Sequence, residues 1–286
     1  MIYYIFLTLS AVLLALNFII TKAYQRLEGT GVAEGFKFNV FIGIATAILF
    51  FCMNGFKLNF SLFSFIISAM PSIFAILYTV VGLKVLKSGN VSLYSLFLMS
   101  GGMLVPYVFG IFYLSERVNI FRIIGILLIL IAIIITNRDK IEKKLLINLV
   151  AIFILNGLVS VFSTLHQVER NLPTVGDMDF IIFTGFWKTI ISSIALLFIK
   201  NEKSKFTFSK KAVLPIIVLS AAVGGIAYIL QLISIANLPA TVSYPILTGG
   251  SIIFTCISGM LFFKEKPSKV QIISIIICFV GTLMFL

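Results

Sequence analysis

Stretches of about twenty apolar residues recur along the whole of this 286-residue chain. A helix of about 20 apolar residues is long enough to cross a hydrocarbon layer about 30 Å thick. The segments between the stretches are short, so we expect no soluble domain. We predict ten transmembrane helices, over residues 2–21, 36–53, 61–83, 91–114, 119–136, 145–165, 179–199, 212–236, 241–263 and 269–286.

The composition indicates that lipid is the solvent of the folded chain. Hydrophobic residues make up 60% of the sequence and charged residues 11%, whereas soluble domains carry about 25% charged residues. Runs such as 123–136 are apolar on every side, unlike the alternating strands of an outer-membrane barrel. The predicted fold class is all-α, a polytopic protein of the cell membrane (inner or plasma membrane).

The basic residues are distributed unevenly between the connecting segments. The net charge of +12 would suggest a nucleic-acid partner in a soluble chain. Here the even-numbered connections hold only Lys57, Arg117, Arg122 and Arg170, while the odd-numbered ones are rich in lysine. The positive-inside rule then places the odd-numbered connections in the cytoplasm and both termini outside. We therefore expect membrane lipids, and no nucleic acid, as partners.

Two parts of the sequence resemble each other. When residues 82–137 are placed against 231–286, Gly101 meets Gly250, Gly110 meets Gly259 and Glu116 meets Glu265. If each half has five spans, an odd number, the halves insert with opposite orientation. This inverted repeat is typical of secondary transporters with a substrate site near the membrane midplane. The predicted units are residues 1–137, a charged connector 138–144, and residues 145–286.

Short motifs resemble those of the drug/metabolite transporter superfamily, specifically its ten-helix EamA-domain branch. The first is Leu16-Asn17-Phe18 with Lys22 in the first span, although Leu14-Ala15 stands where the family usually has Trp-Gly. The second is Leu114–Val118 followed by Gly125, which resembles the family's "G-E-R" turn and recurs as Phe263–Pro267. The resemblance implies a membrane transporter with cytoplasmic termini, whereas the basic residues favour external termini.

Lys188 is the most unusual residue of the predicted spans. It lies in the middle of the seventh span, beside the only tryptophan, Trp187. A lysine at the centre of a bilayer costs about 2.5–3.5 kcal/mol or more, so we expect Lys188 to face a cavity. Its ammonium would then attract an anionic group of a substrate. Alternatively, helix-end carbonyls or the membrane interface satisfy the ammonium.

Other polar and aromatic side chains within the spans could line the same cavity. Tyrosine offers an apolar ring and a hydroxyl, which suits amphipathic metabolites. The alternative for each residue is an interfacial position or a hydrogen bond between helices. The candidates for substrate binding, with Lys188 and Trp187, are Asn17, Tyr78, Tyr94, Tyr107, Asn156, Tyr228, Gln231 and Tyr244.

The remaining titratable residues give little indication of chemistry. We expect His166 to be a solvated residue at the end of the sixth span, although it could titrate near neutral pH. All ten acidic residues lie in connections or at span ends, so proton coupling through a central carboxylate is not expected. Uniport or exchange fits better. Cys52, Cys256 and Cys278 are expected to be packing residues.

The predicted function is secondary transport of small metabolites by alternating access, with export of amino acids or related amphiphilic solutes favoured. The alternative is a flippase for a lipid-linked sugar or lipid precursor. We find no cluster of His, Asp and Glu at one membrane face and no G-x-x-x-x-G-K-[ST] loop. We therefore expect no enzyme activity, no catalytic residue, no metal and no cofactor, in a monomer or homodimer that binds a small-molecule substrate.

Overall fold

The computed structural model describes residues 1–29, 31–87, 91–135, 143–199, 211–263 and 269–285. These residues form ten helices and no strand, which confirms the predicted all-α class. Helix α1 continues past the predicted end of the first span, to Glu28. The helices are α1 (Ile2–Glu28), α2 (Val32–Met53), α3 (Leu62–Lys87), α4 (Val91–Phe112), α5 (Ile120–Ile135), α6 (Lys143–Val168), α7 (Asp177–Leu197), α8 (Val213–Ile235), α9 (Ala240–Phe263) and α10 (Lys269–Leu283).

The helices have the length and surface of membrane spans. Within the described residues, α1, α2, α3, α6, α7 and α8 are each long and apolar enough to cross a bilayer, and α4, α5 and α10 contain shorter apolar helices. Large apolar side chains such as Ile48, Ile134 and Leu197 are mostly exposed, at 58%, 60% and 70%. Because water would not tolerate such a surface, the chain is a multi-pass membrane protein.

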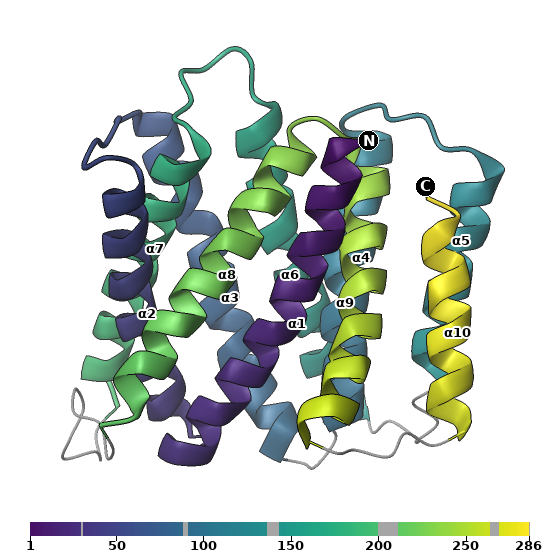
Figure 1. The fold of residues 1–286 in the computed structure, drawn as a ribbon, viewed down its shortest axis with the longest axis horizontal. Helices are drawn as coiled ribbons and strands as arrows, with labels where there is room; N and C mark the ends of the chain where they lie inside the picture. The colour runs from purple at the N-terminus through teal and green to yellow at the C-terminus, as the bar shows by residue number, and fades with distance from the viewer. Residues whose placement is uncertain (30, 88–90, 136–142, 200–210, 264–268, 286) are drawn as a thin grey trace.

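The helices run alternately up and down, so that both termini lie at the same end of the bundle (Figure 1). The connections 54–61, 113–119, 169–176 and 236–239 also lie at that end, which we call the terminal end. The opposite end of the bundle is called the basic end, because the helix ends there flank the lysine-rich segments of the sequence.

Helices of the first half pack mainly against helices of the second half. The largest contacts join α2 to α7, α4 to α6, α1 to α8, α3 to α6 and α5 to α10. When each helix is replaced by the one five places along, the α1–α8 pair becomes α6–α3, and the α4–α6 pair becomes α9–α1, which also pack together. This exchange of partners is the pattern expected of two similar halves related by a twofold axis.

The α2–α7 contact is close because two glycines face each other across it. A methyl group on Gly43 would lie 2.6 Å from the carbonyl oxygen of Gly185 and 2.5 Å from the hydroxyl of Thr189. In lipid there is no hydrophobic driving force for helices to associate. Close backbone packing at small residues therefore provides much of the attraction.

A carboxylate from the first half holds the start of a helix in the second half. Glu116, in the turn between α4 and α5, accepts hydrogen bonds from the backbone N–H groups of Ala240 and Thr241, at 2.7 and 2.8 Å. The first N–H groups of a helix have no partner within the helix, and the helix dipole favours an anion there. Glu116 therefore caps α9 from outside.

We expect Gly43→Ala to destabilise the protein by roughly 1–3 kcal/mol, because the added methyl group overpacks the α2–α7 contact. Gly35→Ala in the same helix is the matched control, since a methyl group there would meet nothing within 4 Å. Thermal unfolding in detergent measures both variants. Equal melting temperatures for the two would show that the glycine contact does not hold the halves together.

Candidate functional site

A cavity of about 420 Å³, lined by both polar and apolar side chains, lies between the two halves of the bundle. Its described lining comes from eight helices, α1–α4 and α6–α9, so each half contributes its first four helices. Helices α5 and α10 do not contribute to this lining and form a separate pair at the edge (Figure 1). The volume is within the range of small-molecule sites in proteins.

The lining combines many neutral polar groups with one charge. Among the described lining residues, Lys188 is the only charged side chain, and none is a carboxylate or an imidazole. Amides are contributed by Asn17, Asn156 and Gln231. Hydroxyl groups are contributed by Thr46, Ser72, Tyr78, Ser160, Ser163, Thr184, Ser220, Tyr228, Tyr244, Thr248 and Ser251.

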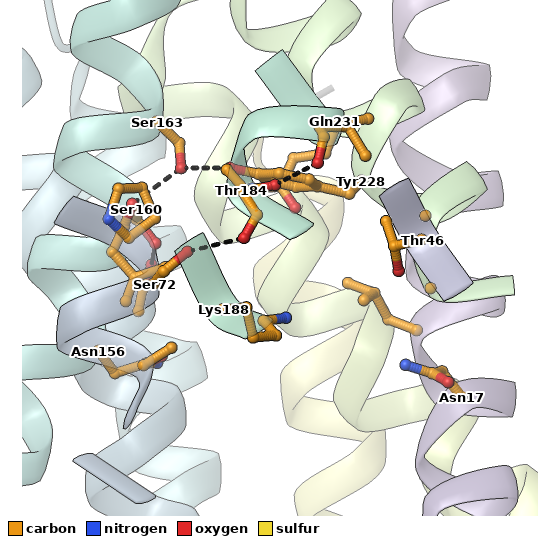
Figure 2. A pocket seen from close by; sticks show the side chains of 18 of the residues that line it. Asn17, Thr46, Ser72, Asn156, Ser160, Ser163, Thr184, Lys188, Tyr228 and Gln231 are labelled. Atoms are coloured by element: carbon orange, nitrogen blue, oxygen red, sulfur yellow. Dashed lines mark hydrogen bonds between the residues drawn. The ribbon is translucent and has the colours of Figure 1, made fainter. Parts of the chain in front are cut away.

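Lys188 extends from α7 into the cavity, with Asn156 on one side and Asn17 on the other (Figure 2). No hydrogen bond or ion pair connects its ammonium to another side chain or carbonyl in the described part of the chain. The structure therefore does not support the alternative in which helix-end carbonyls satisfy this lysine. The ammonium is available to a solute or to water in the cavity.

Asn17 and Asn156 are each held by a hydrogen bond to a neighbouring helix. The side-chain oxygen of Asn17 accepts a 2.6 Å hydrogen bond from the hydroxyl of Ser220 on α8. The side-chain nitrogen of Asn156 donates a 2.7 Å hydrogen bond to the carbonyl of Leu98 on α4. Asn17 consequently has its amide nitrogen free of described partners, and Asn156 its amide oxygen.

Two tyrosines, Tyr228 on α8 and Tyr244 on α9, connect these helices to α6. Figure 2 shows Tyr228 beside Ser163 of α6. The hydroxyl oxygens of Tyr228 and Ser163 lie 2.8 Å apart. Tyr244 donates to the carbonyl of Ser160 at 2.8 Å and also shares a hydrogen bond with the side chain of Gln231. This group, which we call the tyrosine layer, lies in the halves of α6, α8 and α9 that are nearer the terminal end.

The structure brings most of the predicted site residues together. Two of the others lie elsewhere: the Trp187 indole donates to the carbonyl of Phe65 within an aromatic cluster, and Tyr107 is 6% exposed in an apolar core. The side chain of Tyr94 lies outside the described residues. The residues that line the cavity as expected are Lys188, Asn17, Tyr78, Asn156, Tyr228, Gln231 and Tyr244.

The sequence analysis missed the small hydroxyl residues of the cavity. Serine and threonine are common in transmembrane helices, where their hydroxyl groups can also donate to a backbone carbonyl of the preceding turn. Their spacing from the predicted residues was the available signal: Ser160 lies one turn after Asn156, and Thr184 lies one turn before Lys188. Residues four apart lie on the same helix face.

The expectation of a solvated His166 is wrong. Its side chain is 3% exposed, and its ring stacks on Phe180 with ring centres 4.0 Å apart. The Nε2 atom lies 3.0 Å from the hydroxyl of Ser64, which also accepts a hydrogen bond from the N–H of Val175. The connection between α6 and α7 thus folds back over α3 and covers the histidine.

The acidic residue that follows this histidine belongs to the connection itself. Glu169 accepts backbone N–H hydrogen bonds from Arg170, Asn171 and Leu172. These hydrogen bonds, the Asn171 one first, hold the pKa of the Glu169 carboxyl below its usual range. Within the described residues, no group of three or more His, Cys, Asp and Glu side chains could hold a metal ion.

We expect the thiol of Lys188→Cys, in a variant lacking Cys52, Cys256 and Cys278, to react rapidly with a polar thiol reagent. A thiolate forms readily only where water reaches the sulfur, so the rate should exceed that of Ile194→Cys by roughly tenfold or more. Ile194 lies on the same helix and faces outward, at 49% exposure. Equal, slow reaction of both thiols would show that Lys188 faces a dry environment.

Comparison with known proteins agrees with the fold and the motifs. The sequence model of the EamA-like transporter family matches residues 144–286. A solved structure described as "Crystal structure of protein" has a TM-score of 0.77 to this chain at 13% identity, and the match covers 99% of this chain and 95% of that one. At this identity the likeness concerns the fold alone. No curated protein matches the sequence. The family match confirms the resemblance seen in the motifs: the chain belongs to the EamA-like transporter family.

Proposed function

We propose that this membrane transporter is a secondary carrier of small metabolites, and that the cavity around Lys188 is its substrate site. The observation that carries the proposal is an ammonium without a described partner, in a cavity that both halves of the bundle line. A buried charge without a partner is costly, so it is retained where a solute or water compensates it. A carrier in the inner or plasma membrane, acting without chemistry on its substrate, fits this arrangement.

The proposal includes two inverted five-helix units, residues 1–137 and 145–286, joined by the connector 138–144. Most of this connector, residues 138–142, lies outside the described residues. Three observations support the division: the exchange of packing partners between the halves, the equal share of helices in the cavity, and a family match that begins at residue 144. Two similar halves in opposite orientation can exchange conformations, which opens one site to either side in turn.

Asymmetry between the halves supports alternating access. At the terminal end, α6 contacts α8, with the Ser163–Tyr228 hydrogen bond between them. The equivalent pair in the other half is α1 and α3, whose described residues make at most slight contact. We infer a cavity sealed at the terminal end and unsealed at the basic end. In the orientation that the basic residues favour, an exporter would load its substrate from the cytoplasm in this state.

The lining favours small amphiphilic solutes, the class that includes amino acids and their hydroxy-acid and oxo-acid analogues. Lys188 and the amides suit a charged or polar head group, while the rings of Tyr228 and Tyr244 suit an apolar part. The described lining offers no carboxylate that could carry a coupling proton, so the proposal is uniport or exchange. Monomer and homodimer are both compatible with a site that lies within one chain.

Transport by purified protein in liposomes tests the carrier proposal. Vesicles loaded with a mixture of small metabolites should lose a subset of them in a saturable manner. Thr46→Trp fills the cavity and should reduce this efflux by about tenfold or more, while Ile48→Trp, two residues along on the outer face, should not. Retained efflux in Thr46→Trp would place the pathway elsewhere. Movement of labelled lipid instead of solutes would favour the flippase.

We expect Tyr228→Phe to loosen the seal at the terminal end. The lost hydrogen bond to Ser163 is worth about 1 kcal/mol, which shifts the balance of closed and open states about fivefold. An impermeant thiol reagent added at the terminal end should then modify Lys188→Cys faster. Ser163→Ala should have the same effect, and the double variant should add little because both changes remove one contact. An unchanged rate in folded protein would show that the tyrosine layer is not a gate.

A further inference from the structure

The charge of the cavity restricts which solutes it can hold. We propose that the site selects compact solutes with a single net negative charge, such as 2-hydroxy or 2-oxo carboxylates, over zwitterionic amino acids of the same shape. This inference rests on the carrier proposal and narrows its substrate class. It follows from where the positive and negative charges of the described residues lie.

The described acidic residues do not balance the charge of Lys188. Of the ten acidic residues, six are described, and none of the six lines the cavity. Glu28 pairs with Lys37 at 3.1 Å, Glu116 caps α9, and Asp179 accepts hydrogen bonds from Asn54 and Asn59. Each of these carboxylates is therefore occupied elsewhere.

Asp177 lies on the same helix as Lys188. It lies in the first turn of α7 and shares a hydrogen bond with Gln167. Lys188 lies eleven positions further along the helix, a rise of about 16 Å at 1.5 Å per residue. At that distance it does not pair with the ammonium. None of the described acids therefore supplies the counter-charge, which leaves this role to a bound solute.

A second hydrogen-bond donor faces the cavity beside the Lys188 ammonium. The side-chain oxygen of Asn17 is taken by Ser220, so its amide nitrogen remains as a second donor facing the cavity. Figure 2 shows this amide on one side of the Lys188 ammonium. An ammonium and an N–H donor aimed at one space suit a carboxylate, whose oxygens accept several hydrogen bonds.

Hydroxy acids and amino acids differ in the charge that they bring close to Lys188. An amino acid carries its ammonium one carbon from its carboxylate, so a carboxylate bound at Lys188 brings a second positive charge close to the first. The described lining has no anion to balance it, and neutral oxygens compensate a buried charge poorly. A hydroxyl in the same position is neutral and can both donate to and accept from the serine, threonine and amide groups of the cavity.

The same reasoning limits the negative charge to one. A dicarboxylate or a doubly charged phosphate would bring a second negative charge, and no second cation lines the described cavity. The volume of about 420 Å³ suits a compact solute of this kind.

Matched ligand pairs test the inference without any variant. Each pair joins a 2-hydroxy acid to the 2-amino acid with the same side chain, from lactate and alanine to 3-phenyllactate and phenylalanine. In wild-type protein, we expect the best hydroxy acid to bind about tenfold or more tightly than its amino acid, measured by ligand-induced thermal stabilisation and by competition for efflux. Equal or tighter binding of the amino acid would overturn the charge selectivity and leave the carrier proposal intact.

Two variants locate the selectivity. Lys188→Gln should reduce hydroxy-acid affinity by about tenfold or more and remove the preference over the amino acid. Lys57→Gln, which removes an exposed lysine outside the cavity, should change neither. Binding of no pair member would overturn the proposed substrate class, whereas the carrier proposal fails only if the efflux test with Thr46→Trp and Ile48→Trp fails.

Discussion

A hydrocarbon solvent offers no hydrogen bonds, and this constraint decides where each polar group of the chain can lie. Helices satisfy their own backbone, which is why ten of them account for nearly all the described residues. Several hydroxyl groups are satisfied on the preceding turn, as with Thr8 on Tyr4 and Ser251 on Leu247. The polar side chains that cannot do so must meet one another or enclose water, and the cavity lies where they gather.

Lys188 is a charged residue in a cavity whose other described lining residues are neutral. The described side chains of the lining therefore supply no opposite charge to its ammonium. A carrier needs a site that holds its substrate firmly enough to select it and loosely enough to release it. A single cation that only the solute neutralises meets both needs, because the empty site pays no price for a protein ion pair that would have to break.

The ten spans, the helical class and seven of the cavity residues could be predicted because length and hydrophobicity specify a transmembrane helix. Which side of each helix faces inward could not, since apolar residues surround these helices on every side and give little periodic signal. Tyr107 and Tyr244 illustrate the difficulty: both lie in proline-containing helices, yet only Tyr244 reaches the cavity. His166 was misjudged because its cover comes from α3 and α7, far away in sequence.

The cap on α9 has a mechanical consequence. Because Glu116 holds the N–H groups of Ala240 and Thr241, the corner between α4 and α5 is fastened to the first turn of α9. A rearrangement that tilts α9 must therefore also move this corner, so the two shift together as one rigid unit. Tyr244 lies within the next turn of that unit, and its displacement from Ser160 would be transmitted across the bundle rather than absorbed locally.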